Sequence, residues 1–160
     1  MTDRADRSFS DRPVALDDVP GRLVLDAPAA EEVLDLVHAM VEQLWTQGAG
    51  GTPRDRLRFE TAVIEVLANI VEHAHRVDAT VEPPREERRL TVAVALREGA
   101  AWAAFADNGR PVALDLGAVT LPDDDAESGR GLALTLAAVD EVAYARVEGR
   151  NHWSLRCDLG

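Results

Sequence analysis

The chain of 160 residues has the length of one domain, and its apolar content of 46% and charged content of 29% are those of a folded globular protein. A formal net charge of −12 at pH 7 excludes the broad basic surface of a nucleic-acid-binding protein, so nucleic acid is not expected as a partner. The single cysteine, Cys157, excludes an internal disulfide, and no apolar run is long enough for export or a membrane span, so we expect a cytoplasmic protein without a membrane partner.

The first residues differ in composition from the rest of the chain. Residues 1–20 mix charged with small residues and show no hydrophobic period, which predicts a flexible N-terminal tail. Residues 21–160 are expected to form the domain. Within it, residues 22–26 predict a short strand, and apolar residues at helical spacing from Ala30 to Leu44 predict an amphipathic helix that ends near Gly48.

A second helix is predicted from an N-cap at Thr52 to about Arg76, with proline in its first position. Glu65 and Asn69 lie about 40° apart on its circumference, within one polar stripe. A solvated helix face is one interpretation of this stripe. The other is a site, because a carboxylate and a carboxamide one turn apart can bind a hard cation or activate a hydroxyl group. Asn69 favours a ligand, since asparagine is a poor residue inside a helix.

The second half of the chain predicts more strands. Apolar and polar residues alternate over 90–96, and 100–107 predicts a second strand. A loop rich in Pro, Asp and Gly follows over 109–128, then a buried helix over about 129–140 and a closing hairpin over 141–159. This order predicts an α+β fold, a two-layer sandwich in which about three helices cover one face of a mixed β-sheet.

Two glycine-containing segments are candidate ligand sites. Asp107 precedes the pair Asn108-Gly109, which is typical of a tight hairpin turn. A carboxylate beside a glycine could also accept a hydrogen bond from an exocyclic amine while a flat ring approaches. Gly129, Arg130 and Gly131 open the buried helix, where backbone donors and the guanidinium favour an anion, although a helix start without a ligand is equally simple. Neither a Rossmann fingerprint nor a P-loop is present.

Three stretches together resemble a known family. In chain order, EVLANIVEHA, FADNGRP and ESGRGLALTLAAVDEVAY resemble the N, G1 and G2 boxes of the GHKL superfamily, the Bergerat-fold ATP-binding domains. Over about residues 21–159 the chain is similar to the anti-sigma-factor serine/threonine kinases of bacterial partner-switching systems. The trailing glycine of some G2 boxes is absent, and His75 stands where many relatives have tyrosine, which leaves affinity and partner choice open.

The resemblance implies roles for single residues. Asn69 matches the ligand of the Mg²⁺ ion that bridges the ATP phosphates, and Glu65 matches the general base of the kinases. Asp107 matches the acceptor for the adenine amine, and Gly109 the position where adenine comes close. The residues that match the phosphate-side box are Gly129, Arg130 and Gly131.

The resemblance also implies a function. The chain would use Mg²⁺ and ATP to phosphorylate a serine or threonine of an anti-sigma-factor antagonist protein, and would otherwise sequester a sigma factor. Relatives form homodimers, so a homodimer is expected by analogy. The alternative is an ATP-binding module that captures a partner without phosphoryl transfer, for which the carboxylate of Glu65 is dispensable.

Overall fold

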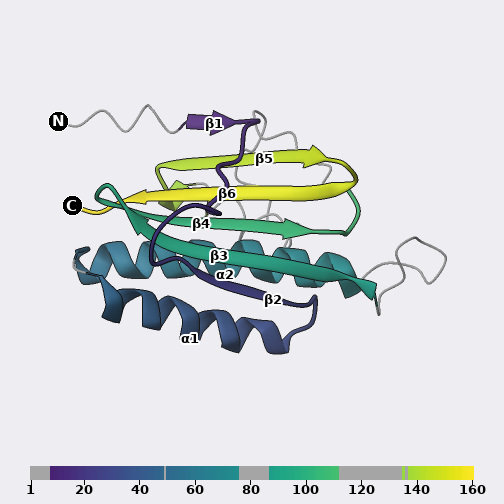
Figure 1. The fold of residues 1–160 in the computed structure, drawn as a ribbon, viewed down its shortest axis with the longest axis horizontal. Coiled ribbons are helices and arrows are strands. Elements are labelled where there is room, and N and C mark those ends of the chain that lie inside the picture. The colour runs from purple at the N-terminus through teal and green to yellow at the C-terminus, as the bar shows by residue number, and fades with distance from the viewer. Residues whose placement is uncertain (1–7, 49, 76–86, 112–134, 136) are drawn as a thin grey trace, which may run out of the picture.

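The computed structural model describes residues 8–48, 50–75, 87–111, 135 and 137–160, which form two layers, a β-sheet and a pair of helices (Figure 1). The helices are α1 (Glu32–Gln47) and α2 (Pro53–His75). The strands are β1 (Ser8–Ser10), β2 (Leu23–Pro28), β3 (Arg89–Arg97), β4 (Ala100–Asp107), β5 (Glu141–Val147) and β6 (Arg150–Asp158).

The strands form one sheet in the order β1-β5-β6-β4-β3-β2. The five strands from β2 to β6 pair antiparallel, while β1 pairs parallel with β5. Both α1 and α2 cover the same face of this sheet (Figure 1), which confirms the predicted α+β class. The predicted third helix lies mostly outside the described residues; within it, residues 135, 137 and 138 are helical.

The core lies between the sheet and the two helices. Apolar side chains recur at helical spacing on α1 and α2 and at alternate positions on the strands, so each element turns one face inward. The inner face of β6 carries Trp153, Leu155 and Cys157, which are all buried. Burial also raises the pKa of the Cys157 thiol to about 11, which makes it unreactive at neutral pH.

The start of α2 is fixed by a reciprocal pair of hydrogen bonds. The Asp55 amide donates to Thr52 Oγ1 at 3.1 Å, and the Thr52 amide donates to Asp55 Oδ2 at 3.0 Å. Such a pair satisfies helix donors that lack partners within the helix. One turn on, Arg58 donates to the carbonyl oxygens of Ala138 and Asp158, at 2.9 and 3.0 Å. These contacts anchor α2 to the sheet.

Two tight hairpins set the register of the sheet. The β3–β4 turn contains Glu98 and Gly99 at φ 52° and 73°, and the β5–β6 turn contains Glu148 and Gly149 at φ 51° and 76°. Two successive residues with positive φ are typical of the turn type whose twist matches paired strands. Each turn fixes the register within its own hairpin. The two hairpins then pair through β4 and β6, which places Asp107 opposite Asn151.

The segment before β2 is part of the packed structure. Besides forming β1, residues 8–20 cross the face of the sheet that the helices leave open, where Leu16 and Val19 are buried. The Val14 amide also donates to Ser154 Oγ at 2.9 Å. This segment therefore differs from the expected flexible tail; its few apolar anchors follow no period, so the sequence pattern did not reveal them. The first seven residues lie outside the described part.

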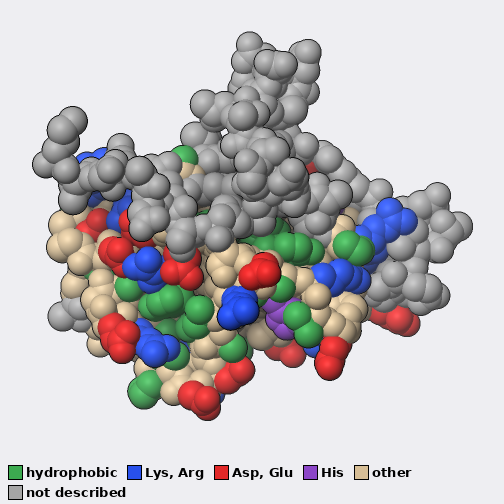
Figure 2. Space-filling model, turned by 90° about the horizontal axis from the view of Figure 1, so that it is seen from above, with side chains coloured by type: hydrophobic (Ala, Val, Ile, Leu, Met, Phe, Trp, Pro, Cys, Tyr) green, Lys and Arg blue, Asp and Glu red, His purple; other side chains and the backbone are tan. Residues whose placement is uncertain are grey.

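The surface carries both signs of charge. Figure 2 shows acidic and basic side chains interspersed with apolar ones over the described part of one face. No single-sign patch dominates what is described on this face. In the described ranges, no helix is long and apolar enough to cross a membrane.

Candidate functional site

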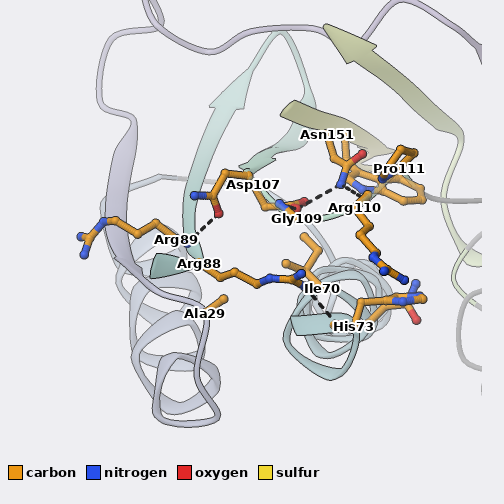
Figure 3. Close-up of a pocket in the computed structure, with 13 residues that line it drawn as sticks. Ala29, Ile70, His73, Arg88, Arg89, Asp107, Gly109, Arg110, Pro111 and Asn151 are labelled. Carbon is orange, nitrogen blue, oxygen red and sulfur yellow. Dashed lines mark hydrogen bonds between the residues drawn. The ribbon is translucent and has the colours of Figure 1, made fainter. Parts of the chain in front are cut away.

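A pocket lies between α2 and the ends of the central strands (Figure 3). Asn69, Ile70 and His73 of α2 form one wall, and Asp107 and Asn151 of the sheet belong to the other. The remaining lining residues are Ala29, Arg88, Arg89, Asn108, Gly109, Arg110, Pro111 and Trp153. Three of the predicted site residues, Asn69, Asp107 and Gly109, therefore line one pocket although they come from different elements.

Asp107 is the last residue of β4 and is only 5% exposed. Its Oδ1 accepts two hydrogen bonds, from the Gly109 amide at 2.8 Å and from Asn151 Nδ2 at 3.1 Å. Its Oδ2 has no hydrogen-bond partner among the residues described. Burial raises the pKa of Asp107, and the two hydrogen bonds oppose that shift by stabilising the charged form. The pocket thus contains a buried carboxyl group with one oxygen left to accept from a ligand.

The structure rules out one of the two interpretations of the Asn-Gly pair. The hairpin interpretation is wrong, because both sides of β4 are occupied, by β3 and by β6, and no return strand can follow. Instead Asn108 extends the pairing with β3, since its Oδ1 accepts from the Arg89 amide at 2.9 Å. A Cβ atom on Gly109 would lie 2.8 Å from Asp107 Oδ1, too close for a relaxed structure. The glycine therefore makes room for the carboxylate to fold back.

The two predicted residues on α2 present unengaged oxygens. Neither Glu65 nor Asn69 has a hydrogen bond or ion pair with any residue in the described ranges. Asn69 lines the pocket, whereas Glu65 lies one helical turn earlier, about 6 Å along the axis, and is not among the lining residues. The helix start with Gly129, Arg130 and Gly131 lies outside the described residues, so its position relative to the pocket stays a prediction.

Sequence reasoning missed Asn151, the second residue of β6. It is 2% exposed and donates from Nδ2 both to Asp107 and to the Arg110 carbonyl oxygen, the latter at 2.6 Å. The linear sequence offers no signal for it, because Asn151 is 44 residues from Asp107 and looks like part of a turn. Only the register that pairs Asp107 with Asn151 brings the two side chains together.

Arg88 and Trp153 were also missed. Arg88 is 2% exposed and donates from Nη1 to the His73 carbonyl oxygen at 3.3 Å, bridging the pocket to the last turn of α2 (Figure 3). A cation is favourable there because helix carbonyls lack partners at that end. Trp153 is 1% exposed and packs against Tyr144 with the rings tilted by 53° and their centroids 4.6 Å apart. Its indole N–H has no hydrogen-bond partner among described residues.

The chemistry of the pocket suits a nucleotide base, but its enclosed volume is small. The enclosed part measures about 20 Å³, which holds a water molecule but not a base. Arg110 and Pro111 line the pocket and are exposed at its rim. The Asp107 carboxylate can take an amine donor, and Asn69 can offer an amide oxygen to a hard cation that also binds phosphates. The donor set thus fits both groups.

Comparison with known proteins decides the family. Residues 27–157 match the family described as the histidine kinase-like ATPase domain. The chain belongs to this family. It is a GHKL-type ATPase domain, for which the family implies ATP binding. The matched range spans both walls of the pocket. No curated protein matched the chain.

A solved structure shares the fold of this ATPase domain. The crystal structure of the RsbU and RsbW domains of Rv1364c from Mycobacterium tuberculosis superimposes with a TM-score of 0.59 at 22% sequence identity. The alignment covers 86% of this chain and 32% of that chain. The ATPase domain thus corresponds to about a third of that protein, and at this identity the likeness supports the fold alone.

Proposed function

We propose that this ATPase domain is a serine/threonine protein kinase and anti-sigma factor. It would transfer the γ-phosphoryl group of ATP, in the presence of Mg²⁺, to a serine or threonine of an anti-sigma-factor antagonist protein. When it is not engaged with that antagonist, it would sequester a sigma factor as a homodimer. The proposal rests on the resemblance of the three boxes to the anti-sigma-factor kinases and on membership of the ATPase family.

One observation carries the nucleotide part of the proposal. The side chains of Asn69 and Asp107 line the same pocket, with an unengaged amide on the helix wall and an unengaged carboxylate oxygen on the sheet wall. Asp107 Oδ2 would accept from the exocyclic amine of adenine beside Gly109. Asn69 would offer its oxygen to the metal ion.

The phosphate side would use the helix start. The backbone donors of Gly129 and Gly131, together with the Arg130 guanidinium, would bind the phosphate oxygens. A bound Mg²⁺ ion would supply charge neutralisation at the phosphates. Glu65 would accept the proton of the attacking serine or threonine hydroxyl. The hydroxyl oxygen would then bond to the γ-phosphorus, and the bond between that phosphorus and the bridging oxygen of ADP would break.

A second function has one observation in its favour. Glu65 is not among the residues that line the pocket, so the proposed base lies a turn away from the residues that would hold the nucleotide. An ATP-binding module that captures its partner without phosphoryl transfer needs no base at that position. The two functions therefore differ in what Glu65 does.

Phosphoryl transfer is tested with the full chain and γ-labelled ATP. The protein, Mg²⁺ and candidate antagonist proteins are incubated, and label is followed on the candidate. Label on a serine or threonine of one candidate supports the kinase. Binding of ATP without label on any candidate that forms a complex with the chain favours the capture module instead.

The variant Glu65→Ala separates the two functions. We expect the rate of transfer to fall by on the order of 100-fold or more, because a general base is lost, while the dissociation constant for Mg-ATP changes by less than about 2-fold. Thr61→Ala is the matched control, one turn earlier on the same exposed stripe. Unchanged transfer by Glu65→Ala would remove the residue from the mechanism.

A further inference from the structure

The amide of Asn151 uses all of its hydrogen-bonding capacity. Its Nδ2 donates to Asp107 Oδ1 at 3.1 Å and to the Arg110 carbonyl oxygen at 2.6 Å. Its Oδ1 accepts from the Tyr144 hydroxyl at 2.6 Å and from Arg146 Nη1 at 3.0 Å. A carboxamide has two N–H donors and two lone pairs, so the group is saturated.

These partners fix which way the amide faces. A carboxylate and a backbone carbonyl can only accept, whereas an arginine can only donate. Turning the amide over would set acceptor against acceptor and donor against donor, so one orientation is favoured. The cation that enforces it, Arg146, is itself held, because it also donates to the carbonyl oxygens of Gly109 and Gly149, at 3.0 and 3.1 Å. The β5–β6 hairpin therefore holds the amide rigidly.

The consequence appears at Asp107. Two donors, Asn151 Nδ2 and the Gly109 amide, both bind the same oxygen, Oδ1. The rotation of the carboxylate is thereby fixed, and Oδ2 is the oxygen left for a ligand. A carboxylate held in this way can accept a hydrogen bond from a ligand amine. A ligand carbonyl oxygen in the same position would be repelled, because it and Oδ2 are both hydrogen-bond acceptors.

We propose that Asn151 is a positioning residue that sets base selectivity by holding Asp107 so that its Oδ2 favours a 6-aminopurine over a 6-oxopurine. This inference rests on the proposed nucleotide function and deepens it. Asn151 acts through Asp107 and makes no contact with the reacting atoms. Its other donor holds the Arg110 carbonyl oxygen, so the same amide also fixes the turn at the mouth of the pocket.

The test compares two nucleotides that differ at one position of the base. Calorimetry with the full chain measures Mg-ATP and Mg-inosine triphosphate, which carries a 6-oxo group in place of the 6-amino group. The wild type is expected to prefer ATP by on the order of 10-fold or more. In Asn151→Ala we expect ATP affinity to fall by on the order of 10-fold while inosine triphosphate affinity falls much less, so that the ratio collapses.

Ser154→Ala is the matched control. Ser154 is a buried polar residue on the same strand, also 2% exposed, but its hydroxyl accepts from Val14 on the opposite face of the sheet. It should leave the ratio unchanged. If Asn151→Ala lost affinity equally for ATP and for inosine triphosphate, the residue would have a merely structural role and the inference would be overturned.

A second variant guards against a folding defect. Asn151→Asp keeps the shape of the side chain but replaces the donor that faces Asp107 by an oxygen. The ratio of affinities should again collapse, and a crystal structure without nucleotide should show the Asp107 carboxylate turned away. An Asp107 carboxylate left in place overturns the inference. If wild-type protein binds neither nucleotide, the proposed function fails; if it prefers ATP and both variants keep that preference, only the inference fails.

Discussion

The two walls of the pocket are built differently. On the sheet wall, Asp107 is buried and receives two hydrogen bonds, with Asn151 saturated behind it. On the helix wall, Asn69 is partly exposed and makes no hydrogen bond with a described residue, and the same holds for Glu65, which lies one turn earlier outside the pocket lining. The sheet wall is thus preorganised before any ligand arrives, whereas the helix wall has polar atoms available for one. Such a division suits rigid recognition of a base and coordination of metal and phosphates that come with the ligand.

The largest effect is expected on the preorganised wall. Asp107→Ala removes the proposed acceptor for the base and should weaken Mg-ATP binding by on the order of 100-fold. Calorimetry measures the change, and a thermal unfolding curve checks that the variant is folded. Binding of ATP within a few-fold of wild type by a folded variant would contradict the role of the sheet wall.

Removal of the helix-wall amide should have a smaller and metal-dependent effect. Asn69→Ala is expected to weaken Mg-ATP binding by on the order of 10-fold, because one proposed oxygen ligand of the ion would be lost while the phosphates would keep the others. The same variant should bind ATP in EDTA as the wild type does. Equal weakening with and without Mg²⁺ would show that Asn69 contacts the nucleotide itself.

Gly109→Ala tests the close packing behind the acceptor. The added Cβ would lie 2.8 Å from Asp107 Oδ1, so the carboxylate must shift and ATP affinity should fall several-fold, by about 1 kcal/mol. Arg110→Ala, at the next and exposed position, is the control and should leave the position of the carboxylate unchanged. If Gly109→Ala keeps full affinity, the fixed position of Asp107 is not needed for binding.

The smallest effects concern stability, where two buried carboxyl groups should respond to pH with opposite signs. The Thr52 amide and hydroxyl lower the pKa of Asp55 from 3.8, so the stabilisation by Asp55 is present above that value and is lost as pH falls through the folded-state pKa. Asp55→Asn should cost about 1 kcal/mol at pH 7 and less in acid.

Asp107 is the opposite case. Burial raises its pKa from 3.8, so its contribution to stability is fully present below that value and is lost as pH rises through the folded-state pKa. Asp107→Asn should therefore gain stability relative to wild type as pH rises through that window. Urea unfolding of nucleotide-free protein between pH 3 and 7 measures both variants. If the free energy of unfolding of Asp55→Asn and of Asp107→Asn, each relative to wild type, changed with pH in the same direction, the assignment would be contradicted. The Asp107 carboxylate would then not be a group that is held for binding at a cost in stability.

Much of the fold could be predicted from local patterns. The strand predicted over 100–107 coincides with β4, and the helix predicted after the Thr52 cap begins where α2 does. Both features depend on residues close in sequence. The packing of Leu16 and Val19 could not be predicted, since two anchors without a period give no local signal. The same limit applied to the site, where the sequence boxes named Asp107 but not its partner Asn151.

The sequence by itself determined the two helices and the strands from β2 to β6, their inward faces and the candidate ligand residues, because hydrophobic period, caps and short motifs act over a few residues. The tertiary structure decided that Asn69 and Asp107 share one pocket, that β4 lies between β3 and β6, and that Asn151 holds the acceptor carboxylate. These facts depend on strand order and register between distant segments, where a shift of one residue would turn every side chain to the other face.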